Sequence, residues 1–216
     1  MELNKFNIDL ATEFFLGNTT IFDGLDDNYK NMFMAYATDN NSSTLREYAT
    51  MNFLNYVSYF KKHGADGYNP ITNVQIELKP KYIHSNQKVS SSGNFNDMTM
   101  LLLEQKKDYN IVCSAFCDKS FVYIVEFPIN IIYDHLKKPI ENAKLGRRVV
   151  CHFGYKQYDN NDLIVHYLNE ENTTTSIPPI NLACFDVGNI TGPGTQIKNL
   201  TFKGKSGDTY TFETTS

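Results

Sequence analysis

The stretch that decides the fold is GADGYNPITNVQIELK, residues 64–79. Its second half alternates apolar and polar side chains, with single polar residues between Val74, Ile76 and Leu78. This alternation is typical of a β-strand that has one apolar and one polar face. The proline, asparagine and threonine residues at 69–73 favour a tight connection to a preceding arm. The stretch therefore predicts a β-hairpin with arms at 65–68 and 74–83.

Charged side chains mark the polar face of this hairpin. Glu77 and Lys79 are two positions apart, so a strand places them side by side, and the first arm brings Asp66 close to them. Mg²⁺ prefers hard oxygen ligands, which Asp66, Glu77 and the carbonyl of Leu78 can supply. Lys79 can orient or help deprotonate a water that attacks a phosphodiester. The alternative interpretation is a charged, solvated edge strand, on which Glu77 and Lys79 form an ordinary salt bridge.

Further elements are predicted on both sides of the hairpin. The clearest helix spans 44–62, where apolar side chains recur at three- and four-residue steps after a capping-box pattern, Thr44 to Glu47. A polar loop is expected at 85–96. The remaining expectations are a helix at 97–107, strands at 110–116 and 121–127, a helical segment at 129–144 interrupted at Pro139, and a strand- and loop-rich region at 148–216.

This order of elements, with an Asp on one hairpin arm and Glu-x-Lys on the next, resembles the PD-(D/E)xK or restriction-endonuclease-like nucleases. The resemblance covers residues 44–127. It implies an α/β (α+β) fold with a central mixed sheet flanked by helices, and Mg²⁺-dependent phosphodiester hydrolysis at Asp66, Glu77 and Lys79. One departure is that Asp66 follows Gly-Ala, where the family motif has a proline.

Many enzymes of this family draw another acidic residue from the helix before the hairpin. Glu47 occupies that place and is the candidate additional metal ligand. Its position in a capping box is the alternative explanation for an acid there.

Candidate DNA contacts lie in polar and basic segments. Small residues at 91–99 lead into a predicted helix N-terminus, where backbone N–H groups can bind a phosphate. The alternative is a linker that ends in an ordinary helix cap, and for the basic residues a solvated face. The candidate DNA-binding residues are Lys81, Lys88, Ser92, Asn94, Arg147 and Arg148.

Composition limits the class of protein. The 216 residues are 41% hydrophobic and carry a net charge of −4, which argues against a surface coated in positive charge. No apolar run approaches the ~20 residues that span a bilayer, and no signal-peptide pattern is visible at the start of the sequence. We therefore expect a cytoplasmic protein with reduced, buried cysteines. We expect a nuclease core at 1–145 and a strand-rich extension at 146–216, packed on the same domain.

Together these observations predict an endonuclease for double-stranded DNA, best matched by a type II, sequence-specific restriction endonuclease. The absence of a Gly-x-x-x-x-Gly-Lys-Ser/Thr motif favours a stand-alone enzyme without a nucleotide cofactor. Cutting both strands of a palindrome requires two active sites, so a homodimer is expected. The alternatives are a junction-resolving, repair, phage or viral nuclease of the same fold, and a non-catalytic DNA-binding or structural protein.

Overall fold

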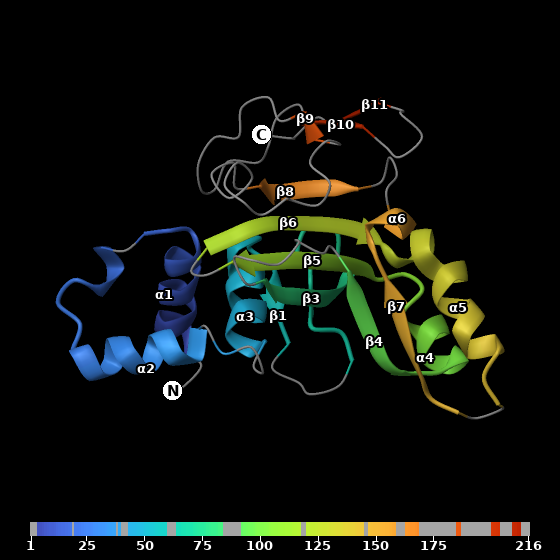
Figure 1. Ribbon diagram of the computed structural model, residues 1–216, viewed down its shortest axis with the longest axis horizontal. Helices are drawn as coiled ribbons and strands as arrows, with labels where there is room; N and C mark the ends of the chain where they lie inside the picture. Colours follow the sequence, from blue (N-terminus) through green and yellow to red (C-terminus); the bar gives the residue numbers. More distant parts are fainter. Residues whose placement is uncertain are drawn as a thin grey trace.

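The protein is a mixed α/β structure with a central mixed sheet flanked by helices (Figure 1). This computed structural model describes residues 4–18, 20–37, 39, 43–59, 64–83, 92–117, 120–144, 147–158, 163–168, 185–186, 200–203 and 209–212. In the first half of the chain the elements are α1 (Lys5–Phe15), η1 (Thr20–Phe22), α2 (Asp27–Ala37), α3 (Thr44–Phe53), β1 (Val57–Ser58), β2 (Gly67–Tyr68), β3 (Gln75–Ile83), β4 (Gly93–Met98) and α4 (Met100–Gln105). In the second half they are β5 (Asn110–Cys117), β6 (Ser120–Pro128), η2 (Ile129–Ile132), α5 (Tyr133–Glu141), β7 (Val149–Phe153), α6 (Tyr155–Tyr158), β8 (Ile164–Leu168), β9 (Phe185–Asp186), β10 (Leu200–Lys203) and β11 (Thr209–Phe212).

The central sheet has six strands in the order β1-β2-β3-β5-β6-β8. Strands β3 and β5 are parallel, and all other neighbours in this sheet are antiparallel. The predicted hairpin is confirmed as β2 and β3, in which Gly67 pairs with Ile76 and Tyr68 with Gln75. The strands predicted at 110–116 and 121–127 are confirmed as β5 and β6, each slightly longer than expected.

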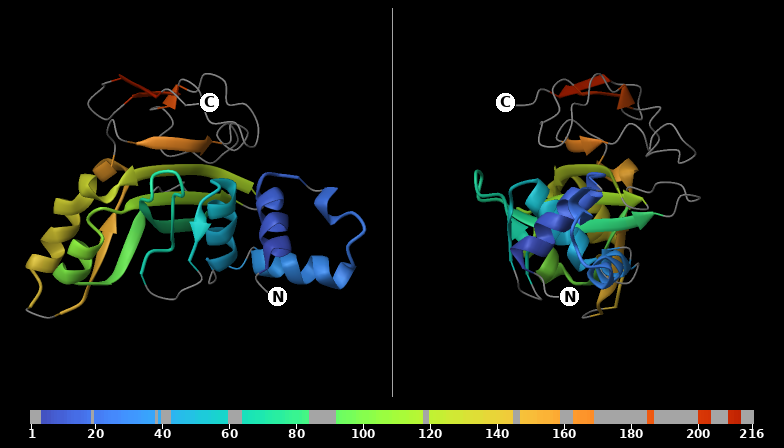
Figure 2. Two further views of the ribbon diagram at one scale, coloured as in Figure 1. Left: turned by 180° about the vertical axis from the view of Figure 1, so that it is seen from behind. Right: turned by 90° about the vertical axis from the view of Figure 1, so that its left-hand side faces the viewer.

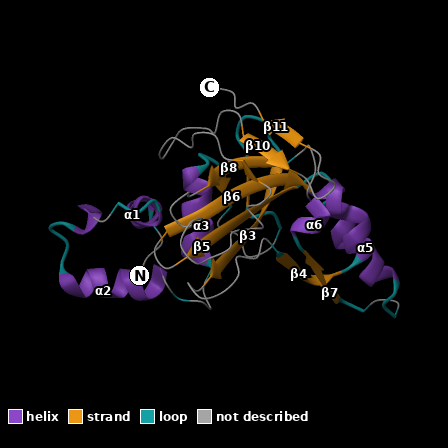
Figure 3. Cartoon of the chain, turned by 45° about the horizontal axis from the view of Figure 1, so that its top comes forward, coloured by secondary structure: helices purple, strands orange, loops and turns teal. Residues whose placement is uncertain are grey.

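Alternating apolar side chains on β5 divide the core into two layers. Ile111, Cys113 and Ala115 belong to the cluster that α4, α5, β4 and β7 cover, whereas Val112 and Phe116 belong to the cluster under α1, α2 and α3. The two clusters are separate because successive residues of a strand point to opposite faces of the sheet. Figures 2 and 3 show α1 and α2 gathered at one end of the strands and α4 and α5 at the other.

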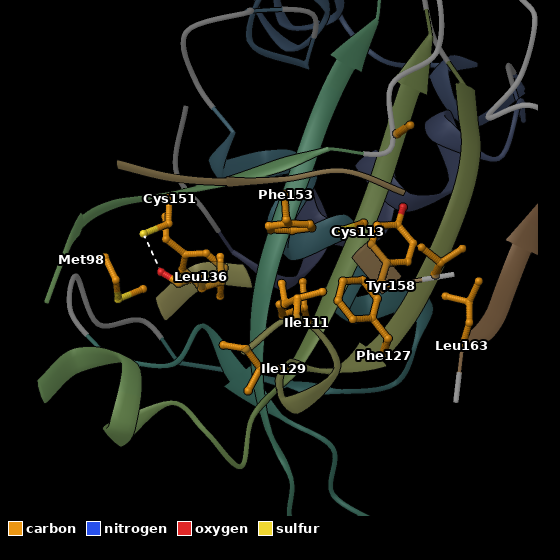
Figure 4. Close-up of a cluster of buried hydrophobic side chains, with 14 of the residues drawn as sticks. Met98, Ile111, Cys113, Phe127, Ile129, Leu136, Cys151, Phe153, Tyr158 and Leu163 are labelled. Atoms are coloured by element: carbon orange, nitrogen blue, oxygen red, sulfur yellow. Dashed lines mark hydrogen bonds between the residues drawn. The ribbon is translucent and has the colours of Figure 1, made fainter. Parts of the chain in front are cut away.

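The first cluster contains the two cysteines whose side chains the structure describes. Cys113 and Cys151 are both buried and free, as the sequence predicts. The thiol of Cys151 donates to the Leu136 carbonyl oxygen at 3.4 Å, and Phe127 stacks on Tyr158 with ring centres 4.2 Å apart (Figure 4). These contacts explain the cysteines as core packing.

The helix predicted at 44–62 is wrong at 54–59, and its last residues, 60–62, lie outside the described part of the chain. Helix α3 ends at Phe53, and Asn55 has a left-handed backbone with φ 56°. Asparagine tolerates this conformation, which stops a helix. Val57 and Ser58 then form the edge strand β1. The apolar residues at 56–57 therefore do not belong to the helix.

The segment at 85–98 also differs from expectation. Residues 84–91 lie outside the described part of the chain, but Gly93–Met98 form β4, which pairs antiparallel with β7. The pairing shifts between Phe95 and Met98, and Asp97 within this shift has φ 55°. Helix α4 therefore starts at Met100, with Thr99 as its N-cap, and not at Asp97.

The C-terminal region is described only in short pieces. Strand β7 pairs with β4 and β8 pairs with β6, while β10 pairs with β9 and β11 in a separate small sheet. Most of the strand-rich extension expected at 146–216 lies outside the described residues. The domain boundary at 145–146 remains a prediction. No helix in the described parts of the chain is long and apolar enough to cross a membrane.

Candidate active site

Asp66 directly precedes the two-residue strand β2 and is positioned by hydrogen bonds to β3. Its backbone N–H donates to the Ile76 carbonyl at 2.9 Å, which continues the ladder between β2 and β3 by one bond. Among the described residues no strand pairs with β3 beyond that bond on this side, and the Leu78 N–H donates to Asp66 Oδ2 at 2.6 Å instead. The carboxylate of Asp66 thus lies against the exposed edge of β3, close to Glu77.

Glu77 and Lys79 lie side by side on β3, as predicted. Lys79 Nζ is 2.6 Å from Glu77 Oε1 and 4.6 Å from the ring centre of Phe95 on β4. Glu77 is buried, with 8% of its surface exposed, and Lys79 is largely covered. This burial contradicts the alternative of a solvated strand face, because neither charge projects freely into water.

Lys106 is a site residue that the sequence did not reveal. Its Nζ lies 2.5 Å from Glu77 Oε2, so each oxygen of Glu77 contacts one ammonium group. Lys106 is the C-cap of α4, in the turn that leads into β5. Because β3 and β5 are parallel, the chain returns after α4 to the start of β3. Recognising this crossover in the sequence would have predicted that a side chain from the turn after α4 lies near Glu77.

The pKa values of Asp66 and Glu77 are shifted in opposite directions. Burial raises the pKa of Asp66 to about 6, repulsion from Glu77 adds to the rise, and the Leu78 N–H and Lys79 oppose it. Burial also favours a higher pKa for Glu77, but Lys79 and Lys106 outweigh it, so the pKa of Glu77 is lowered. Asp66 is therefore the carboxylate that a further cation stabilises most.

Glu47 lies close to this pair. It lines a pocket together with Leu78 and Lys79, and its charge contributes to the raised pKa of Asp66. The expected capping box is wrong in detail. Ser43 is the N-cap of α3, and its hydroxyl donates to Glu47 Oε1 at 2.6 Å without a side-chain bond to the helix backbone.

The donor set suits a hard divalent cation. Within the described residues, no three His, Cys, Asp or Glu side chains form a metal-binding group. The acidic ligands at the centre would be Asp66 and Glu77, and the third oxygen would come from the backbone. Because the Leu78 N–H points to Asp66, its carbonyl faces the same edge of the strand. Two carboxylates and a carbonyl, completed by water, fit Mg²⁺.

The pocket beside Lys79 encloses about 380 Å³ and continues along β3 and β4. Lys81, Ser92 and Asn94, three of the predicted DNA contacts, line it. Lys81 Nζ is 3.2 Å from Ser92 Oγ, and burial lowers the pKa of Lys81. Within the run at 91–99, where a phosphate-binding helix N-terminus is predicted, Gly93–Met98 form a strand, and Ser92, Gly93, Asn94 and Asn96 line the pocket. Residue 91 lies outside the described part of the chain.

The other predicted DNA contacts are not brought to this pocket. Arg147 and Arg148 are exposed just before β7, at the end where Val149 pairs with Met98. The pocket lies toward the opposite end, where Asn94 pairs with His152. Lys88 lies outside the described residues.

A second buried carboxylate, also missed from the sequence, lies on the other face of the sheet. Glu126 on β6 is 2% exposed and accepts hydrogen bonds from Tyr56 at 2.8 Å, His166 at 2.7 Å and Asn110 at 2.6 Å. Burial opposes ionisation, but the bonds from His166, Asn110 and Tyr56 outweigh it and lower the pKa of Glu126. Because each carboxylate oxygen of Glu126 accepts a hydrogen bond from the protein, we interpret this cluster as stabilising the fold.

No protein-family model and no curated protein matches this sequence, so the geometry of Asp66, Glu77 and Lys79 carries the functional argument.

Proposed function

We propose that this protein is a Mg²⁺-dependent endonuclease of the PD-(D/E)xK superfamily that hydrolyses double-stranded DNA. The observation that carries the proposal is the convergence of Asp66, Glu77 and Lys79 on β3 just beyond the end of β2, beside a pocket with a basic and polar wall. A mixed sheet with a parallel β3-β5 pair and flanking helices supports the same assignment.

The roles of the side chains follow from their charges. Asp66, Glu77 and the Leu78 carbonyl would hold the metal ion, and Glu47 would reach it directly or through water. When bound, the ion supplies a Lewis acid that activates water and offsets charge on the phosphate. Lys79 would orient the attacking water and stabilise the negative charge that develops on the phosphate oxygens. Its contact with the Phe95 ring restricts where the ammonium can lie.

The pocket gives the neighbouring phosphates a place to bind. Lys81 and Ser92 form a linked donor pair on its wall, and Asn94 lies on the adjacent strand. Positively charged and hydroxyl donors are the usual partners of phosphate oxygens. We extend the proposal to a type II restriction endonuclease acting as a homodimer, in which Arg147 and Arg148 contribute outside this pocket and Lys88 is a further candidate DNA contact.

Cleavage of phage-length linear DNA tests the proposal. Wild-type protein should give discrete fragments with Mg²⁺ and none with EDTA, and Glu77→Ala and Lys79→Ala should lose this activity. Discrete fragments support a restriction enzyme, whereas selective cutting of branched DNA would indicate a junction-resolving enzyme of the same fold. If folded wild-type protein cuts neither duplex, single-stranded nor branched DNA, the catalytic proposal is wrong.

A further inference from the structure

Each carboxylate oxygen of Glu77 already contacts one ammonium group, which leaves fewer lone pairs for a metal ion. Lys79 Nζ lies 2.6 Å from Oε1, and Lys106 Nζ lies 2.5 Å from Oε2. Both lysine side chains are largely buried, with 17% and 14% of their surface exposed. Removing water strengthens such contacts, so each ammonium competes effectively for its carboxylate oxygen.

The two lysines approach Glu77 from different places. Lys79 lines the pocket in which a phosphate would bind. Lys106 comes from the turn after α4, where its Nζ is also 3.4 Å from the Gly64 carbonyl and 5.1 Å from the ring centre of Tyr109. These additional contacts hold Lys106 in position, and they leave Lys79 as the lysine suited to act on the substrate.

We infer that Lys106 is a resident counter-cation of Glu77 that competes with the divalent metal for Oε2. The inference rests on the proposed function and adds to it a residue outside the motif. A metal ion at this oxygen must share it with the Lys106 ammonium or displace that group, and the positive charge also repels the ion. Lys106 therefore stabilises the metal-free protein and raises the metal concentration at which the site fills.

Calorimetric titration of the full chain with Mn²⁺, in the absence of DNA, tests this inference. Lys106→Met should bind Mn²⁺ about tenfold more tightly than wild type, because one unit charge a few ångströms from the ion has been removed. Lys106→Arg keeps the charge and should bind as wild type does. Lys107→Met is the matched control, since Lys107 is the exposed neighbouring residue, and its affinity should also be unchanged.

Thermal unfolding gives a second readout on the same proteins. Without metal, Lys106→Met should melt below wild type, because buried Glu77 has lost one of its two partners. Saturating Mn²⁺ should raise the melting temperature of Lys106→Met more than that of wild type. If Lys106→Met does not fold, Lys106→Gln carries the same two predictions.

The outcomes separate this inference from the proposed function. Wild-type binding of Mn²⁺ with equal or weaker binding by folded Lys106→Met would overturn the competition and leave the metal site standing. An absence of Mn²⁺ binding by both proteins would overturn the metal site, and the inference with it.

Discussion

At the scale of single residues, the buried carboxylates follow one rule. Asp66, Glu77 and Glu126 all lose solvent, and the partners each one gains decide whether its pKa rises or falls. Glu77 has two ammonium groups and Glu126 has three hydrogen-bond donors, whereas among the described residues Asp66 has the Leu78 N–H as its donor. Incomplete compensation at Asp66 is typical of a carboxylate that works on a ligand.

Glu126→Gln should lower the free energy of unfolding at pH 7 by about 1–3 kcal/mol, because it weakens a buried network. A pKa lowered by folding contributes stability above the unfolded-state value, and this contribution is lost as the pH falls through the folded-state value. The difference between wild type and variant should therefore narrow below about pH 4.5. Urea unfolding across this pH range measures it.

Glu141→Gln is the control for that experiment. Glu141 pairs with Lys137 across one helical turn at the surface, so its loss should change stability by less than about 0.5 kcal/mol. A difference for Glu126→Gln that grows as the pH falls would contradict the account of the network.

At the scale of elements, the β4-β7 ribbon restricts the position of Lys79, the proposed catalytic lysine. Gly93 on β4 lies between the Phe153 ring and the Lys79 side chain, and a Cβ added there would lie 2.4 Å from Phe153 Cζ and 3.1 Å from Lys79 Cγ. The absence of a side chain at this position lets β4 approach β3 closely enough to pack Phe95 against the lysine. The ribbon is thus part of the proposed site.

Gly93→Ala should lower the free energy of unfolding by about 1–3 kcal/mol through overpacking. It should also reduce the rate of DNA cleavage, since the added methyl group would lie 3.1 Å from Lys79 Cγ and displace that side chain. Gly154→Ala is the matched control, because its added Cβ would meet only Gln157 Oε1 at an ordinary 3.5 Å. Thermal unfolding and cleavage rates of both variants measure the two effects. Equal behaviour of the two variants would contradict the packing argument.

The elements also show what the sequence could and could not reveal. The alternation at 74–79 predicts β3 and the Glu77-Lys79 pair because both depend on local geometry alone. Strand β4 was missed because its Gly- and Asn-rich sequence resembles a loop, and its partner β7 is distant in the chain. Lys106 was missed for a related reason. Its contact with Glu77 arises from the crossover into β5, which no local pattern reports.

At the scale of the whole molecule, the net charge is negative although the pocket beside Lys79 contains two lysines. The chain carries a net charge of −4. The described pocket along β3 and β4 is nevertheless lined by two lysines, Lys79 and Lys81, together with Ser92 and Asn94. DNA affinity should therefore depend on a few contacts in this pocket and not on a generally basic surface.

Lys81→Ala should weaken DNA binding and reduce the magnitude of the slope of log K against log[salt] by about 1, because one phosphate contact is lost. Binding measured in EDTA at several salt concentrations tests this without cleavage. Lys138→Ala, which removes an exposed lysine on α5, should leave the slope unchanged. Equal slopes for wild type and Lys81→Ala would remove this pocket from the DNA-binding surface.

The most direct test of the central claim is the rate of Mg²⁺-dependent plasmid cleavage by Asp66→Asn. Asparagine can still accept the hydrogen bond from the Leu78 N–H, so the substitution removes a charge and spares the fold. Cleavage should fall by about 100-fold or more, while Asp108→Asn, an exposed control, should cut as wild type does. Undiminished cleavage by Asp66→Asn, or wild-type cleavage that continues in EDTA, would contradict the metal-dependent site.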